Sequence, residues 1–448
     1  MSVRERMVRL CAGGGHEHLC DGKVSTILAR WRSTPPHLQT AITPSVLNAR
    51  LSTGVRIRRE HFGAVAYVPR RDHFFALDAD HAVLAQRLSA RGAHRIEGRQ
   101  RELAVALAEI GICVTDPPTA QRAFFGRSVI GRIGDLPTCR LPLVVNCFAT
   151  SHCPLRCGYC HADDLMTGYR DRENPHWLRR VMRVAAATPA MVGVVTGGEP
   201  LSRPDRAEQL ITALARDKAV VLDTSGVGDF PRLVPLLREV GAHVRVSLDS
   251  ADQRVNDALR PTSRRYVPAG TSSHRYALDT LRRAVQADIP CSVQTVVNSR
   301  NGELTGLLQL RDILLGLGVN TWVLHVVVSA GKAATRPGSS LLSGPGTLGI
   351  LDDLVTQAAA DNAAIDIRVT STHRTPNSVL LISAQGELAV ENPAGGGKHT
   401  LVVPRLFARR AVTHQFARHI DGHGHASRYL NGTLTEYQDR TGAVLPRP

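Results

Sequence analysis

From residue 141 onward, short apolar runs alternate with longer stretches whose apolar residues recur at helical spacing. The apolar runs predict six strands, at residues 143–148, 191–196, 219–223, 243–248, 292–297 and 322–328. Helices are predicted between them, for example at residues 176–187, 206–215, 232–240, 276–287 and 304–317. Strands that alternate with helices in this way are typical of an α/β fold with a parallel sheet.

The pattern before residue 120 differs and predicts a separate small α+β domain over residues 46–120. Three strands are predicted at residues 55–58, 63–68 and 73–77. Asp78 or Asp80 can cap a helix that runs through Leu84 and Leu88 and ends at Gly92, and a second helix is predicted near residues 100–110. Three strands followed by two helices give this domain a winged-helix-like order.

The other segments carry weaker patterns. Residues 1–45 are interpreted as a flexible N-terminal segment, residues 121–140 as a linker, residues 141–340 as the parallel-sheet domain and residues 341–448 as a C-terminal extension. Two groups of residues invite a metal-binding interpretation. The first is Cys11, His16, His18 and Cys20, whose spacing matches no known ligand motif. The second is His414, His419, His423 and His425, which has no partner cysteine nearby. Solvated tails are the favoured interpretation of both groups.

Composition limits the class of protein. The 448 residues are 43% hydrophobic, which predicts a globular chain of two or three domains. No run of about 18 apolar residues is present, so neither a transmembrane helix nor a membrane partner is expected. Nine cysteines, an odd number, favour a reducing cytoplasm over a disulfide framework. The net charge is +16, but the basic residues form no block and aromatic residues are only 4%, so nucleic acid is disfavoured as a partner.

Three cysteines follow the strand predicted at residues 143–148, in the spacing Cys-x3-Cys-x2-Cys: Cys153, Cys157 and Cys160. Thiolates are soft ligands that hold iron–sulfur clusters. Three of them can bind three irons of a [4Fe–4S] cube and leave the fourth iron open for a substrate or cofactor. The alternatives are buried free thiols or a zinc site, in which His161 or His152 can supply a fourth ligand.

This spacing, with Tyr159 directly before the last cysteine, resembles the signature of the radical S-adenosylmethionine (SAM) enzymes. The resemblance implies a [4Fe–4S] cluster whose open iron is chelated by the amino and carboxylate groups of SAM. One electron then cleaves SAM to methionine and a 5′-deoxyadenosyl radical, which abstracts a hydrogen atom from the substrate. The resemblance also implies a partial (β/α)6 TIM barrel with its site at the carboxyl ends of the strands.

Further motifs at predicted strand ends match those that bind SAM in this family. The strand at residues 191–196 ends in a glycine-rich turn that resembles the motif for the methionine moiety, Gly197-Gly198-Glu199-Pro200. Ser247 and Arg260 match residues that contact the ribose or the carboxylate of SAM. Ser225 and Asn298 follow two other strands and are expected to line the same pocket. A surface carboxylate and a helix-surface arginine are the alternatives for Glu199 and Arg260.

The N-terminal domain resembles the precursor-peptide recognition element of ribosomal peptide biosynthesis, a winged-helix-like domain also found in a pyrroloquinoline quinone biosynthesis protein. The matching pieces are residues 59–63, the strand that ends at Leu77-Asp78 and the helix that follows. The resemblance implies that an extended leader peptide adds a strand to an exposed sheet edge. A generic winged helix or a structural cap is the alternative.

The chain has no cysteine after Cys291. Many peptide-modifying radical SAM enzymes carry a C-terminal cysteine-rich domain, called SPASM or twitch, that binds auxiliary clusters. Residues 379–388 resemble the start of that domain without its cysteines. A single cluster is therefore expected.

These features predict a radical SAM enzyme that modifies a ribosomally made precursor peptide by a crosslink or an epimerisation. Its expected partners are the precursor peptide and an electron donor such as flavodoxin or ferredoxin. An epimerase needs a hydrogen donor, and Cys147 is better placed for this role than Cys291 because it lies near the end of a strand. A buried structural role is the alternative for both thiols.

Two other functions remain open. The first is a radical SAM enzyme that acts on RNA or a small metabolite. If the substrate is RNA, its binding is expected to be sensitive to salt and not to be displaced by a leader peptide. A non-catalytic scaffold that binds zinc predicts a colourless protein that does not cleave SAM.

Overall fold

The computed structural model describes residues 46–90, 92–121, 129–131, 141–160, 162, 174–327, 332–335, 346–370, 380–391 and 398–401. All of them belong to one compact unit, Val46–Ala443. The expectations for residues 1–45, for His161 and for the four C-terminal histidines lie outside the described residues. Within the described part of the chain, no helix is long and apolar enough to cross a membrane.

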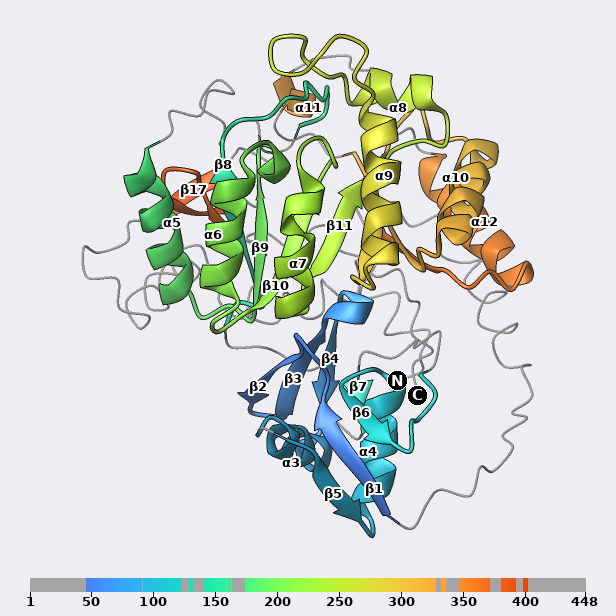
Figure 1. Ribbon diagram of the computed structural model, residues 1–448. Coiled ribbons are helices and arrows are strands. Elements are labelled where there is room, and N and C mark those ends of the chain that lie inside the picture. The colour runs from blue at the N-terminus through green and yellow to red at the C-terminus, as the bar shows by residue number, and fades with distance from the viewer. Residues whose placement is uncertain are drawn as a thin grey trace, which may run out of the picture. The chain divides into compact units, whose positions relative to one another are not determined.

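The N-terminal part is built from two small sheets and two helices (Figure 1). One sheet has the strand order β5-β1-β6, from β1 (Val46–Leu51), β5 (His94–Glu97) and β6 (Cys113–Asp116). The other has the order β2-β3-β4-β7, from β2 (Arg56–Glu60), β3 (Gly63–Val68), β4 (His73–Leu77) and β7 (Val129–Ile130). Helices α3 (Ala79–Leu88) and α4 (Gln100–Glu109) share one apolar core with these strands.

The three strands and two helices predicted in this part are present as β2, β3, β4, α3 and α4. Asp78 caps α3, because its carboxylate accepts a hydrogen bond from the backbone N–H of His81 at 3.0 Å. The sequence pattern missed β1, and it missed β5, β6 and β7, which are too short to carry much periodicity. The likeness to a winged helix stays a prediction.

A ten-stranded sheet follows, in the order β14-β13-β12-β11-β10-β9-β8-β15-β16-β17. Strands β8 to β14 are all parallel, and they are β8 (Val144–Thr150), β9 (Val192–Gly197), β10 (Ala219–Thr224), β11 (His243–Ser247), β12 (Cys291–Val297), β13 (Thr321–Val326) and β14 (Asp366–Thr370). β15 (Leu380–Ile382) is parallel to β8, and β16 (Leu388–Glu391) and β17 (Lys398–Leu401) continue antiparallel.

The α/β class and the parallel sheet are confirmed, and β8 to β13 are the six predicted strands. The sheet is larger than predicted, because β14 extends it at one edge and β15 to β17 extend it at the other. The curvature of a partial barrel stays a prediction.

Helices cover one face of the parallel sheet. They are α5 (Pro175–Ala187), α6 (Pro204–Leu214), α7 (Phe230–Val240), α9 (Ser273–Gln286), α10 (Leu304–Leu317) and α12 (Thr347–Ala360). Figure 1 shows α5, α6, α7 and α9 side by side in front of the strands. Their buried side chains share a core with every second strand residue, such as Val145, Val195 and Val244. The other strand residues therefore point to the opposite face, which we call the second face.

The hairpin of β3 and β4 packs on the second face at the amino ends of β9 and β10. Its residues Val65, Tyr67, Phe74 and Ala76 share a core with Val192, Val194, Ala219 and Val221. The short helix η2 (Pro69–Arg71) and Asp72 form the turn of this hairpin. Both carboxylate oxygens of Asp72 accept hydrogen bonds from the guanidinium of Arg245, at 2.6 and 2.7 Å. Apolar contact and a buried ion pair thus fasten the hairpin to the sheet.

The ion pair is closely enclosed. Asp72 is 1% exposed, and Tyr67 donates a hydrogen bond to the same carboxylate at 2.7 Å. Arg368 of β14 donates to the backbone carbonyls of Arg71 and Asp72. Burial by itself raises the pKa of Asp72, but the charge and hydrogen bond of Arg245, with His243 and Arg368 nearby, together outweigh it and hold this pKa well below its usual range.

We expect Arg245→Ala to lower the free energy of unfolding by about 3 kcal/mol, because it leaves the Asp72 carboxylate buried without its main partner. The measurement is the urea midpoint followed by circular dichroism. The double variant Asp72→Asn, Arg245→Met buries no unpaired charge and should recover part of the loss. Equal midpoints for the parent and Arg245→Ala would show that the pair contributes nothing.

Candidate active site

The three motif cysteines lie in the loop that follows β8. Their side chains belong to one apolar cluster with Phe148, and none of the three is in a disulfide bond with a described cysteine. Burial raises the pKa of Cys157 to about 11, and burial together with the neighbouring Cys157 thiol raises the pKa of Cys153 well above its usual range. Thiols that perturb one another in this way are close together, as the ligands of one cluster must be.

The donor set fits a [4Fe–4S] cluster. Three thiols gather in one cluster of side chains, and a cube takes each thiolate at a different iron. No three His, Cys, Asp or Glu side chains in the described part of the chain converge as the ligands of a single metal ion do. A cube does not require such convergence of its three thiolates.

The turn after β9 explains why glycine follows this strand. Gly198 N–H donates to the Thr150 carbonyl at 2.9 Å, and Glu199 N–H donates to the His152 carbonyl at 2.8 Å. A Cβ atom on Gly198 would lie 2.0 Å from the His152 carbonyl oxygen, and one on Gly197, whose φ is +133°, would lie 2.4 Å from that of Thr150. The two glycines thus let the cysteine loop run directly beside the end of β9.

Glu199 is a buried carboxylate that links the turns after β9 and β10 by hydrogen bonds, and it is not a surface carboxylate. It is 1% exposed. One carboxylate oxygen accepts from Leu201 N–H and the Thr224 hydroxyl, and the other accepts from the N–H and hydroxyl of Ser225, all within 3.0 Å. Burial raises the pKa of Glu199, although these hydrogen bonds oppose the rise. With four donors the carboxylate is saturated by the protein itself, and Ser225 serves as one of its partners.

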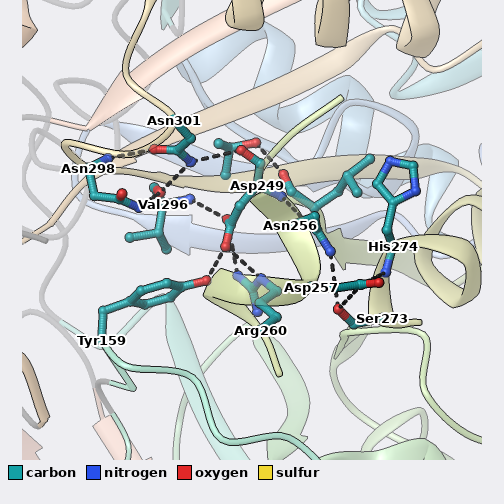
Figure 2. Close-up of polar contacts among 12 residues, drawn as sticks. Tyr159, Asp249, Asn256, Asp257, Arg260, Ser273, His274, Val296, Asn298 and Asn301 are labelled. Carbon is teal, nitrogen blue, oxygen red and sulfur yellow. Dashed lines mark hydrogen bonds and ion pairs between the residues drawn. The ribbon is translucent and has the colours of Figure 1, made fainter. Parts of the chain in front are cut away.

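A buried carboxylate, Asp249, joins the cysteine loop to the ends of β11 and β12. Figure 2 shows Tyr159, Arg260 and Val296 around it. The Tyr159 hydroxyl and Arg260 Nε both donate to Asp249 Oδ2, the latter at 2.8 Å, and Val296 N–H donates to Oδ1 at 2.9 Å. A second bond from Arg260 reaches Oδ1 at 3.3 Å, and its guanidinium lies 5.4 Å from the centre of the Tyr159 ring.

These contacts give Arg260 a structural role. The SAM contact implied by the family resemblance stays a prediction, but the guanidinium already pairs with Asp249 and is buried at the end of α8 (Gln253–Leu259). Burial lowers the pKa of Arg260, but the charge and hydrogen bond of Asp249, with Tyr159 and Cys157 nearby, together outweigh burial and raise this pKa well above its usual value. Its clearest structural contribution is to position Asp249 and Tyr159.

Asn298 is connected to Asp249 through the side-chain amide of Asn301. Asn298 N–H donates to Asn301 Oδ1 at 2.8 Å, and Asn301 Nδ2 donates to the Asp249 carbonyl at 2.7 Å (Figure 2). The Asn298 side chain itself bonds Val296 and Arg300 backbone groups. Its polar groups therefore shape the turn after β12. Sequence reasoning missed Asp249 and Asn301, although both follow strand ends.

Half-buried polar side chains lie along the second face of the strands, and the set is Asn146, Thr196, Asp223, Arg245, Ser247, Gln294 and His325. Pairing across the sheet places Asp223 beside Arg245 and Ser247 beside Gln294. We call these seven residues the polar row. Their partial exposure indicates that solvent, or a substrate, reaches this face.

Cys147 does not belong to the polar row. It shares the helix-side core with Val145 and Ala149, is 0% exposed, and burial raises the pKa of its thiol to about 12. Cys291 lies in the same core, 8% exposed. A thiol on the helix side is separated from the second face by the sheet itself, so the placement supports the structural alternative for both cysteines.

A surface groove of about 1050 Å³ lies elsewhere, over helices α5, α6 and α7. Arg183, Glu208 and Arg216 are among its lining residues, and neither the cysteines nor the polar row contribute to it. The chemistry-bearing residues are therefore not associated with this groove.

Comparison with known proteins agrees with this geometry. Residues 148–301 match the model of the Radical SAM superfamily. A PqqA peptide cyclase of Streptomyces rochei is 30% identical over 177 residues, which is 38% of this chain and 44% of the relative. An AdoMet-dependent heme synthase of Methanosarcina barkeri is 27% identical over 192 residues, 41% of this chain and 50% of the relative. The chain thus spans about half the length of these curated relatives.

Among solved structures, Streptococcus suis SuiB bound to its precursor peptide SuiA resembles this chain with a TM-score of 0.54 at 12% identity. The likeness covers 87% of this chain and 94% of SuiB, and at this identity it shows the fold alone. Residues 148–301 thus resemble the radical SAM superfamily, which uses a [4Fe–4S] cluster and SAM.

We expect Gly198→Ala to reduce the iron and sulfide bound after anaerobic reconstitution, because the added Cβ displaces the His152 carbonyl and the cysteine loop with it. The matched control is Gly306→Ala in α10, where a Cβ meets nothing within 4 Å. Iron and sulfide per chain are the measurement. Full loading of Gly198→Ala would show that the loop tolerates the shift.

The charge of Asp223 should make stability depend on pH. Burial raises the pKa of Asp223 to about 6, above the usual value of 3.8. Between these two pH values the folded state therefore keeps a proton that the unfolded state has lost. Stability attributable to this group is therefore present at low pH and falls as the pH rises through 6. We expect Asp223→Asn to melt at a higher temperature than the parent at pH 7.5 and to lose that advantage at pH 4. A difference independent of pH would contradict this assignment.

Proposed function

We propose that the protein is a radical SAM peptide maturase, which binds one [4Fe–4S] cluster through Cys153, Cys157 and Cys160 and modifies a ribosomally made precursor peptide. The observation that carries the proposal is the joining of the cysteine loop to three strand ends. Gly198 and Glu199 tie it to β9 and β10, and the Tyr159–Asp249 contact ties it to β11. These contacts join the loop to the turns that follow the three strands.

When bound, the cluster and SAM supply a 5′-deoxyadenosyl radical that abstracts a hydrogen atom from the substrate. The chain's own residues bind and orient the reactants. The turn at Gly197 and Gly198 is proposed to meet the methionine moiety through its backbone, and the hydroxyl of half-buried Ser247 can meet the ribose. Pro200 begins η4 (Pro200–Ser202) and stiffens the turn that holds Glu199.

The peptide substrate is proposed from the N-terminal sheets and the relatives together. Among the described residues, β2 pairs only with β3, so its other edge can receive an extended strand. The fold likeness to SuiB extends over this part as well as the radical SAM domain, since it covers 87% of the chain. A crosslink and an epimerisation are both compatible with hydrogen abstraction. Cys147 is not proposed as the hydrogen donor, because it lies in the helix-side core.

An electron donor such as flavodoxin or ferredoxin and a reducing cytoplasmic environment complete the proposal, since the cluster must be reduced before SAM is cleaved. The second candidate is a radical SAM enzyme that acts on a small metabolite. It is supported by the likeness to the heme synthase, which matches about as much of this chain as the peptide cyclase does.

The test is anaerobic reconstitution followed by assay of 5′-deoxyadenosine, with and without the peptide encoded beside this gene. We expect the parent to form deoxyadenosine and Cys157→Ala to form none, because the variant lacks one thiolate of the cluster. A peptide mass lower by about 2 Da would indicate a crosslink, and a gain of about 1 Da in heavy water an epimer.

Cys291→Ala is the matched control, since it removes a buried thiol outside the loop. Deoxyadenosine formation with an unchanged peptide would retain the class and reject this peptide substrate. A colourless parent that binds zinc and leaves SAM intact would reject the proposal.

A further inference from the structure

Asp223 of β10 has a carboxylate oxygen that the protein leaves without a hydrogen bond. Its Oδ1 atom is enclosed and accepts no hydrogen bond in the described part of the chain. Arg245 Nη1 lies 3.7 Å from this oxygen, which is too far for a hydrogen bond. The Nε and Nη2 atoms of the same guanidinium donate to Asp72 instead. An enclosed oxygen of this kind costs free energy until another group supplies the donor.

The position of Asp223 leaves it within reach of a ligand. On β10, Ala219 and Val221 pack against the β3–β4 hairpin on the second face, and Asp223 is the next residue on that face. Its side chain is still 28% exposed, although Oδ1 is enclosed. A group that lies on the second face can therefore approach this carboxylate.

Asp223 also lies beside the glycine-rich turn of the candidate site. Thr224 and Ser225 follow it directly in the chain, and both donate hydrogen bonds to the buried carboxylate of Glu199. Since Glu199 belongs to the turn after β9, these bonds fix the end of β10 next to that turn. A ligand held by Asp223 is therefore held close to the residues that are proposed to meet SAM.

The electrostatic surroundings of Asp223 favour a cation. Burial, with the nearby charges of Asp72 and Glu199, raises the pKa of Asp223 to about 6. Arg245 opposes this rise, but its guanidinium already pairs with Asp72. The Asp223 carboxyl is therefore ionised at pH 7.5 and lacks a cation of its own. Four other members of the polar row carry no charge, namely Asn146, Thr196, Ser247 and Gln294.

We propose that Asp223 binds a cationic side chain, lysine or arginine, of the peptide substrate. The inference rests on the proposed function and names the chemistry that the peptide must carry. An ammonium or guanidinium group can donate to the Asp223 carboxylate and supply the hydrogen bond that the protein does not. Such a bond between two charged groups is stronger than one between neutral groups. It selects peptides with a positive charge and fixes which of their residues lie on the second face.

The test is a double-mutant cycle between Asp223 and the peptide encoded beside this gene. In the peptide, each lysine in turn is replaced by norleucine and each arginine by citrulline, which removes the charge and nearly keeps the shape. Binding to the reconstituted protein is measured by calorimetry at pH 7.5. We expect Asp223→Asn to bind the unaltered peptide at least about tenfold more weakly than the parent does. One altered peptide should bind the parent more weakly by the same factor and should lose nothing further with Asp223→Asn.

The matched control is Asp279→Asn, which removes an exposed carboxylate on α9 and should bind every peptide as the parent does. Melting temperatures at pH 7.5 report on folding. Asp223→Asn removes a partly buried charge and should melt no lower than the parent, so its weaker binding is not a result of unfolding. The altered peptides test the same contact with the parent protein, whatever the variant does.

The proposal is overturned if Asp223→Asn binds the unaltered peptide as tightly as the parent, or if the peptide contains neither lysine nor arginine. It is also overturned if the loss from Asp223→Asn adds to the loss from every altered peptide, because the two charges then act independently. A parent that forms deoxyadenosine but binds no peptide rejects the peptide substrate and this inference together. A parent that forms no deoxyadenosine from SAM rejects the proposed function itself.

Discussion

The buried carboxylate of Asp249 is the constraint on which the candidate site depends. A charge in a protein interior is stable only when paired and hydrogen-bonded, and Asp249 draws its partners from the cysteine loop, the end of α8 and the backbone of β12. Satisfying one carboxylate therefore brings Tyr159, Arg260 and Val296 together. Because Tyr159 lies between Cys157 and Cys160, the same interaction orients the thiol-bearing loop with respect to the strands.

A second buried carboxylate, Glu199, also holds neighbouring turns together by hydrogen bonds. Glu199 takes four hydrogen bonds from the turns after β9 and β10, and the glycines before it allow the loop to lie in backbone contact with β9. Parallel strands all end at one edge, so short polar turns after successive strands meet there. The hairpin that carries Asp72 packs on the second face at the amino ends of β9 and β10, and its carboxylate pairs with Arg245 of the polar row.

Much of this could be predicted from the sequence where the signal is local. The six strands and the helices between them follow from periodicity, and the cysteine spacing with Tyr159 led to the radical SAM class. The contacts of individual side chains could not be predicted in this way. Glu199, interpreted as a possible cofactor ligand, braces two strand ends, and Arg260 pairs with Asp249. Cys147 lies close to the motif in sequence, yet alternation along β8 turns it to the helix side.

The sequence by itself determined the order of elements and the parallel sheet and pointed to three candidate cluster thiols, because each depends on residues that are neighbours in the chain. Only the tertiary structure decided which polar groups hydrogen-bond within the protein and which stay half-buried on the second face. Asp249 and Tyr159 are separated by 90 residues, and Asp72 and Arg245 by 173. No local pattern reports such pairs, since burial of a charge is settled by what the fold brings around it.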